Sequence, residues 1–497
     1  MSNKNKRQSG ILLHISSLPG NYGIGTLGKE ALKFVDFLKT ADVKIWQTLP
    51  LGHSGYGNSP YQCYSAYAGN PLLIDLDWLK NKELLLEVET DKIASKFENS
   101  NKVDFNFVEN YKYRILKTAF QRFKSKENFE VAYDDFCNKN KHWLDDYSLF
   151  ISFKKAFKNT PLSQWQNEVK YRNREILDYY KAKLEDEINF NKFLQYIFFE
   201  QWFELKNYAN KNGIEIMGDI PIYVSADSAD LWSNPHFFQT NDDLSLSKLA
   251  GVPPDYFSED GQLWGNPLYD WKKMENDNFQ WWIKRIEFNC QLFDIVRIDH
   301  FRAFSEFWSV DASEKTAKNG EWISAPGYKL FEAIKNNLGE LKIVAEDLGI
   351  ITQDVEDLRD HFNFPGMKVL QFAFDGSKPN THLPHYHNHN SVVYTGTHDN
   401  DTTKSWFETN DENTKNIFLE YTNSKFNEAV WSMIRLAWSS VAQTAIAPIQ
   451  DFLELDGEER MNTPGTTENN WIFRCKPEQI DEQLAQKIKI LNKIYDR

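Results

Sequence analysis

Residues 294–304 read DIVRIDHFRAF, and this stretch carries the main signal for the fold. The run Ile-Val-Arg-Ile is typical of a strand in a buried parallel sheet, yet it stops at an acid with an arginine two residues earlier on the same face. The stretches IEIMGD, KIVAED and VVYTGTHD end in the same way. The four acids are Asp219, Asp299, Glu346 and Asp399.

The rest of the chain alternates between apolar strand patterns and amphipathic helix patterns. This alternation predicts parallel βαβ units, which fit either an open doubly wound sheet or a closed barrel. Acids from at least four strand ends meet naturally at the C-terminal face of a (β/α)₈ TIM barrel, so we expect the barrel. Predicted strands cover 11–15, 43–51 and the runs IEIMGDIPIYV, KIVAED, MKVLQFAF and SVVYTGT, and predicted helices cover 30–41, KLFEAIKNNL, TQDVEDLRDHF and a run ending before Gly213.

We expect residues 1–497 to form a single catalytic barrel with two insertions. Residues 79–190 are charged, helical in period and poor in β-branched residues, which predicts a largely helical subdomain. Residues 225–271 contain AGVPPDYFSEDGQLWGNPLYDW, a stretch without helix or strand periodicity, which predicts a long active-site loop.

Composition excludes several classes of protein. Asp plus Glu total 71 against 57 Lys plus Arg, a formal net charge of -14, which disfavours nucleic acid and anionic membranes as partners. No apolar run is long enough for a membrane span or a signal-peptide core. The four cysteines lie far apart without a C-x-x-C pair, so we expect reduced thiols and a cytoplasmic protein; the oligomeric state stays open.

Converging carboxylates suit two kinds of chemistry. Glycoside chemistry needs one ionised carboxylate and one protonated carboxylic acid, whereas metal-assisted chemistry would use the same acids as Mg²⁺ ligands. Arg297 favours the first, because a guanidinium keeps Asp299 ionised and would repel a divalent metal. Glu346 follows Ile-Val-Ala, an apolar setting that raises a carboxyl pKa. The match of residues 23–28 to G-x-G-x-x-G lies too far after its strand for a dinucleotide site, which leaves a nicotinamide enzyme as a weak rival.

The stretches VRIDHFR, IVAEDLG and YTGTHDND resemble the catalytic strand-end motifs of the α-amylase superfamily. The residues of these motifs are similar to those of the 4-α-glucanotransferases known as amylomaltase or disproportionating enzyme. The resemblance extends through SGILLHISSLPGNYGIGTLG, GNSPYQCYSAYAGNPLLIDL and FPGMKVLQFAF to MNTPGTTENNW. It covers most of the chain apart from roughly residues 80–190.

The resemblance implies a retaining transfer of α-1,4-glucan segments between maltooligosaccharides, with no cofactor and no metal. It implies Asp299 as the nucleophile, Glu346 as the general acid/base and Asp399 as the acid that stabilises the transition state. The substrate-binding residues that we expect are Asp219, Arg297, His398 and Asn470, with Tyr61, Tyr256, Phe257 and Trp264 as candidate stacking faces.

Two other functions use the same residues. An α-glucan hydrolase shares the first chemical step and differs only in whether water or a sugar hydroxyl attacks the intermediate. A glucan-binding protein without catalysis is the third alternative, although the intact trio of acids argues against it.

Overall fold

A nearly closed barrel of eight parallel strands forms the centre of the computed structural model, which describes residues 6–91, 100–126, 130–254 and 258–497. Around the sheet the strands are β10 (Gly366–Val369), β11 (Ser391–Tyr394), β12 (Thr444–Pro448), β1 (Gln8–Leu12), β2 (Ile45–Gln47), β3 (Glu215–Ile220), β6 (Ile295–Ile298) and β9 (Ile343–Ala345). Each hydrogen-bonded pair of neighbours is parallel. The Ala345 amide donates to the Pro365 carbonyl at 2.9 Å, which joins β9 to the start of β10 and closes the ring.

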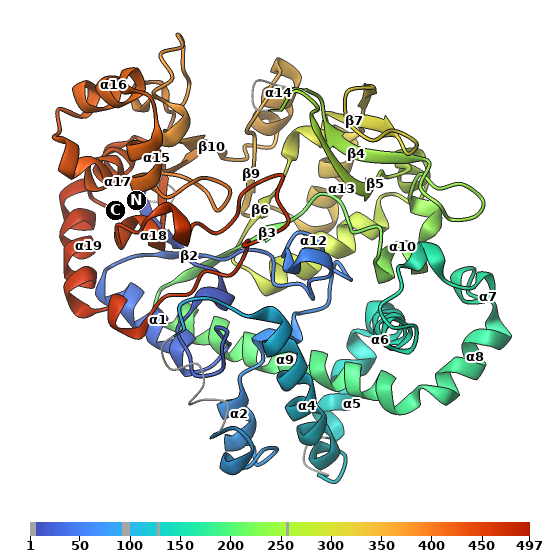
Figure 1. Cartoon of the computed structure of the whole chain (residues 1–497). Helices are drawn as coiled ribbons and strands as arrows, with labels where there is room; N and C mark the ends of the chain where they lie inside the picture. Colours follow the sequence, from blue (N-terminus) through green and yellow to red (C-terminus); the bar gives the residue numbers. More distant parts are fainter. Residues whose placement is uncertain (1–5, 92–99, 127–129, 255–257) are drawn as a thin grey trace.

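Amphipathic helices cover the outside of the barrel (Figure 1). They are α1 (Lys29–Thr40), α9 (Glu185–Lys211), α12 (Gln280–Leu292), α13 (Gly327–Leu338), α14 (Gln353–His361), α17 (Ala429–Ser439) and α19 (Glu482–Tyr495). In α1 the buried residues are Ala31, Phe34, Val35, Phe37 and Leu38, the spacing of a single helix face. The predicted barrel is therefore confirmed, and the open sheet is excluded.

Strand boundaries differ from the prediction at several places. The first strand ends at Leu12 and a 3₁₀ turn, Ile15–Ser17, follows it, while MKVLQFAF gives the short strand β10 and then the 3₁₀ turn Leu370–Phe372. The apolar runs are longer than the strands because the residues beyond each strand remain buried in loops at the top of the barrel, as with Leu49 and Leu51 after β2. Periodicity alone does not separate these two environments.

The segment between β2 and β3 is mainly helical. It contains α2 (Leu76–Asn81), α4 (Phe105–Phe123), α5 (Glu130–Lys139), α6 (Lys141–Ala156), α7 (Asn167–Lys170) and α8 (Arg174–Lys183), and the chain returns to the barrel through α9. In Figure 1 these helices extend from one side of the barrel. We refer to residues 79–190 as the helical insertion.

Residues 225–271 differ from the predicted irregular loop. They include α10 (Ala229–Ser233), β4 (Lys248–Val252) and β5 (Gln262–Pro267), which join β7 (Glu306–Asp311) and β8 (Gly320–Ser324) in an antiparallel sheet ordered β5-β4-β7-β8. The prediction was wrong because β4 is stabilised by pairing with β7, about sixty residues later, and that pairing leaves no local pattern.

Further α-helices are α11 (Trp271–Asn276), α15 (Thr403–Thr409), α16 (Glu412–Thr422) and α18 (Ile449–Phe452). Within the described ranges, no helix combines the length and the apolar character that crossing a membrane requires.

Candidate active site

Three of the predicted acids lie at neighbouring strand ends. Asp219 is the penultimate residue of β3, Asp299 follows β6, and Glu346 follows β9. The Asp299 amide donates to the Ile220 carbonyl and the Glu346 amide to the Ile298 carbonyl, each at 3.0 Å, so the ladder continues one residue past the strands. The rigid sheet therefore fixes the backbone of both Asp299 and Glu346.

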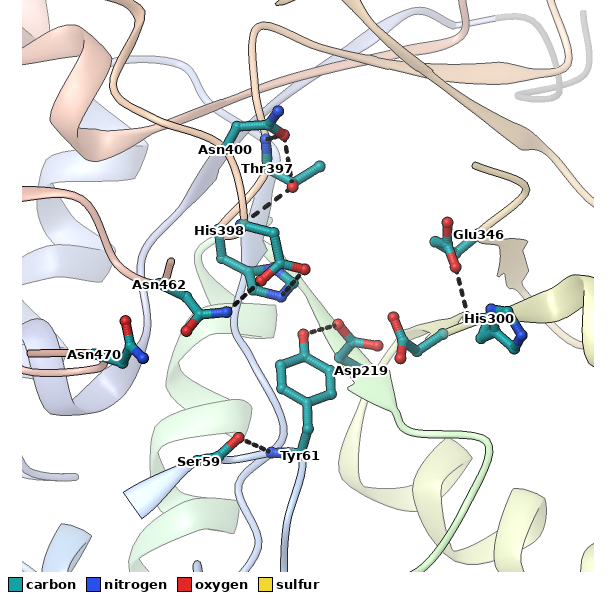
Figure 2. A network of polar contacts seen from close by, with 12 residues as sticks. Ser59, Tyr61, Asp219, His300, Glu346, Thr397, His398, Asn400, Asn462 and Asn470 are labelled. Atoms are coloured by element: carbon teal, nitrogen blue, oxygen red, sulfur yellow. Dashed lines mark hydrogen bonds and ion pairs between the residues drawn. The ribbon is translucent and has the colours of Figure 1, made fainter. Parts of the chain in front are cut away.

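Arg297 joins two of these acids through its guanidinium. Its Nη1 lies 2.6 Å from Asp219 Oδ2 and 3.0 Å from Asp299 Oδ1, and its Nε donates to Met367 Sδ at 3.4 Å. Burial opposes the charge on Arg297, but Asp219 and Asp299 outweigh it and raise the arginine pKa. The Tyr61 hydroxyl donates to the same Asp219 oxygen at 2.8 Å (Figure 2).

Backbone amides hold the Glu346 carboxyl group. Oε2 accepts from the His300 amide at 2.6 Å, and Oε1 accepts from the Leu348 amide at 2.9 Å. His300 has φ 52° and ψ 49°, the left-handed conformation, at the start of the 3₁₀ turn Phe301–Phe304. The turn that follows Asp299 thus points an amide at Glu346, and Figure 2 shows this contact beside Asp219.

Asp299 and Glu346 have different affinities for a proton. Burial is the main cause that raises the pKa of both carboxyl groups, and at Glu346 the negative charge of Asp299 raises it further. The resulting pKa is about 6 for Asp299 and about 8 for Glu346. Arg297 opposes the effect of burial on Asp299 without cancelling it, contrary to the expectation that it would keep this carboxyl fully ionised. Asp299 still ionises first, because its side chain keeps 30% of its exposure and contacts the guanidinium directly.

Asp399 is held in the loop that follows β11. Its Oδ2 lies 3.2 Å from His398 Nε2, its Oδ1 accepts from Asn462 Nδ2 at 2.7 Å, and its carbonyl accepts from Arg460 at 2.9 Å. Burial opposes ionisation of Asp399, but His398 and Asn462 outweigh it and lower the carboxyl pKa to about 2. Burial lowers the pKa of His398, but the charge of Asp399 and the hydrogen bond to it outweigh this effect and raise the pKa.

Tyr61 connects the two halves of the site. Its ring stacks on His398 with centroids 5.1 Å apart and planes inclined by 15°, while its hydroxyl contacts Asp219. A continuous chain of contacts therefore runs from Glu346 through the Asp299 turn to Arg297, Asp219, Tyr61, His398 and Asp399. Figure 2 shows two of its contacts, from the His300 amide to Glu346 and from Tyr61 to Asp219.

The remaining predicted residues lie at different distances from this chain. Trp264 on β5 is partly buried and meets the His300 ring edge-on at 4.7 Å. Asn470 braces its own loop, with Oδ1 accepting from the Thr463 amide at 2.9 Å and Nδ2 donating to Thr466, and in Figure 2 it lies beyond Asn462. Tyr256 and Phe257 lie outside the described residues.

Three residues that contact the candidate active site were not identified from the sequence. Asn462 and Arg460 lie in or beside the MNTPGTT run, whose Pro-Gly turn signals an ordered loop but does not indicate what the loop touches. Met367 lies on β10, where its side chain would be read as an ordinary core residue. None of these carries a periodic or spacing signal that could have singled it out.

Comparisons with known proteins agree with one another. Residues 13–480 match a protein family described as 4-alpha-glucanotransferase. The chain is 48% identical to a 4-alpha-glucanotransferase of Clostridium butyricum over 98% of this chain and 100% of the relative, and 49% identical to one of Synechocystis sp. over 99% and 98%. The solved structure of an amylomaltase from Streptococcus agalactiae in complex with acarbose superposes with a TM-score of 0.96 at 40% identity, covering 99% of this chain and 100% of the other.

Proposed function

The chain belongs to the 4-alpha-glucanotransferase family and has that activity, and on this premise we propose how its residues perform the transfer. In the proposed mechanism, Asp299 is the nucleophile, Glu346 is the general acid and base, and Asp399 stabilises the transition state. The observation that carries the proposal is the continuous chain of contacts that places these three acids around Tyr61, Arg297 and His398.

The first step cleaves the donor glucan. An Asp299 oxygen attacks the anomeric carbon of an α-1,4-linked glucosyl unit while Glu346 gives its proton to the departing glycosidic oxygen. The bond from carbon to the leaving oxygen breaks, the bond to Asp299 forms, and the shortened glucan leaves with the proton. At neutral pH the pKa values of about 6 and about 8 support this division, since Asp299 is mostly ionised and Glu346 mostly protonated.

The second step passes the glucosyl unit to an acceptor. Glu346, now a carboxylate, takes the proton from an acceptor sugar hydroxyl whose oxygen attacks the same carbon and releases Asp299, so that the α configuration is retained. Water in place of the sugar would give hydrolysis. Trp264 on β5 is proposed to favour the sugar by covering the acceptor side next to the His300 turn.

The remaining polar residues are proposed to bind the reacting glucose. Asp399, held ionised by His398 and Asn462, accepts bonds from sugar hydroxyl groups and faces the positive charge that develops on the ring. Asp219 neutralises Arg297, and Tyr61 presents its ring beside His398 as a flat apolar face for the sugar. Asn470 is proposed to support the loop that carries Asn462.

Product analysis with maltotriose tests the transfer. Glucose together with maltooligosaccharides longer than maltotriose is expected, whereas shorter products alone would indicate hydrolysis and unchanged substrate would indicate a binding protein. Because the Streptococcus agalactiae amylomaltase was solved with acarbose, we also expect acarbose to inhibit this chain. Failure of acarbose to inhibit would contradict a shared binding site.

Further parts of the proposal concern the setting of the enzyme. Maltodextrins derived from starch or glycogen are the proposed substrates. A cytoplasmic location is supported by four unpaired cysteines. Residues 79–190 and 225–271 are proposed to act as subdomains carried by loops of one catalytic barrel.

A further inference from the structure

Tyr61 lies in a loop that reverses direction and places its side chain in the candidate active site. Residues 52–69, here called the Tyr61 loop, follow β2 and are held by two isolated antiparallel bridges, Gly52 with Gly69 and Ser54 with Cys63. Between the bridges the His53 amide donates to the Ala68 carbonyl at 3.1 Å, and its carbonyl accepts from the Tyr64 amide at 2.9 Å. Even a complete two-stranded hairpin is marginally stable without outside support, so a loop held by two isolated bridges needs such support.

The helical insertion supplies such support at His53. The imidazole Nδ1 lies 2.8 Å from the Tyr147 hydroxyl on α6, and Nε2 lies 3.1 Å from the Tyr113 hydroxyl on α4. Both tyrosines belong to residues 79–190, and the His53 ring also meets Tyr64 of its own loop edge-on at 5.1 Å. Both nitrogens of one side chain in the loop are therefore bonded to helices of the insertion.

The Gln195 side chain links the base of the Tyr61 loop to the hydroxyl group that contacts His53. Gln195 on α9 accepts from the Gly69 amide at 2.7 Å and donates to the Gly69 carbonyl at 2.9 Å, which fixes the orientation of its amide group. Its Nε2 also donates to the Tyr147 hydroxyl at 3.2 Å, the same hydroxyl that lies 2.8 Å from His53 Nδ1. Burial lowers the pKa of His53 to about 4, which agrees with a neutral ring.

Residues of α9 also hold the base of the Tyr61 loop. Gln195 pairs with both backbone groups of Gly69, and a Cβ at Gly69 would lie 2.1 Å from the Phe198 ring of α9. Only a glycine allows this close approach of the loop to the helix. The loop is thus held at its base by α9 and between its two bridges by α4 and α6, next to the Ser54–Cys63 bridge that encloses Tyr61.

We infer that the helical insertion is a clamp for the active site, in which His53 acts as a positioning residue that holds Tyr61 against Asp219 and His398. The inference rests on the proposed role of Tyr61 at the reacting glucose. His53 itself lies outside the chain of contacts that joins the three acids, so its influence on catalysis passes through the loop.

His53→Phe tests the clamp, because it removes both hydrogen bonds and keeps an aromatic ring. We expect kcat/KM for maltotriose to fall about tenfold, the effect of two lost hydrogen bonds between neutral groups. His53→Gln offers an acceptor and a donor in the same region and should recover most of this loss. In a Tyr61→Ala background, which lacks the ring that the clamp positions, His53→Phe should cause no further loss beyond about twofold, since coupled residues are not additive.

Arg497→Ala is the matched control for general destabilisation. Arg497 is buried beside the N-terminal ends of β1 and β12, where its guanidinium contacts the Gln8 and Gln443 carbonyls, so this variant should lower stability and leave kcat/KM at its normal value below the melting temperature. Hydrogen exchange provides a second measurement, in which amides of residues 52–69 should exchange faster in His53→Phe and stay unchanged in Arg497→Ala.

Three results would overturn the clamp: a normal kcat/KM in His53→Phe, an equal loss with and without Tyr61→Ala, or an equal loss in Arg497→Ala. The proposed catalytic roles would survive all three, because they depend on separate variants of Asp299 and Glu346. A normal rate in Tyr61→Ala would remove the proposed role of Tyr61 and the clamp together.

Discussion

Replacing Glu346 by Gln tests the assignment of the general acid. A glutamate with the ordinary pKa of 4.5 would be protonated in about one molecule in 300 at pH 7. With a pKa of about 8, the protonated form of Glu346 is about tenfold more abundant than the ionised form at this pH. Burial and Asp299 thus provide the acid that the first step consumes. The glutamine oxygen can still accept one of the two backbone bonds from His300 and Leu348, so we expect the variant to fold.

The expected cost is a loss of about 10²–10⁴ in the rate of glucose release from maltotriose, the usual contribution of general acid catalysis. The sign of the pH dependence follows from the raised pKa: the protonated acid is present below about 8 and is lost as the pH rises through that value. Wild-type activity should therefore fall on the alkaline side, by about tenfold per pH unit.

α-Maltosyl fluoride separates the loss of the acid from a loss of folding. Fluoride leaves without a proton, so Glu346→Gln should release a burst of about one fluoride per enzyme and then stall before the acceptor step. This burst should lack the alkaline decline of the wild type. Glu332→Gln, on the exposed face of α13, is the matched control and should keep normal turnover. A maltotriose rate within about tenfold of wild type in Glu346→Gln would refute the assignment.

Four further predictions follow from the same structure. Asp299→Ala should lose several orders of magnitude in turnover and show no fluoride burst, and a normal burst would exclude Asp299 as nucleophile. Asn462→Ala removes one of the contacts that hold Asp399, so kcat should fall about tenfold with little change in melting temperature; an unchanged kcat would show that the contact is dispensable. Arg497→Ala should lower the unfolding free energy by about 3 kcal/mol in urea titration, because the Arg497 guanidinium donates hydrogen bonds to backbone carbonyls that include those of Trp438 and Ser440. A change below about 0.5 kcal/mol would contradict this. Treatment with EDTA should leave the transfer rate unchanged, whereas a loss that added Mg²⁺ or Ca²⁺ restores would point to a metal role for the acids.

Much of the site could be predicted because its acids follow strands. Asp219, Asp299 and Glu346 each come at the end of an apolar run, and parallel strands of a barrel bring such ends to one face. Asn462, Met367 and the amide of His300 could not be found in the same way. Asn462 acts from a loop, Met367 resembles a core residue, and the His300 contact depends on a backbone conformation that no side-chain pattern records.

The sequence by itself determined the barrel, its outer helices and the acids at the strand ends. Each of these depends on the spacing of apolar residues and on which residue follows a strand, and both are local properties of the sequence. Only the tertiary structure decided what depends on contacts between distant segments. It placed 225–271 partly in an antiparallel sheet, raised the pKa values of both Asp299 and Glu346 through burial, and brought Tyr113 and Tyr147 to His53. These features follow from desolvation and from pairing across space, which the spacing of residues along the chain does not encode.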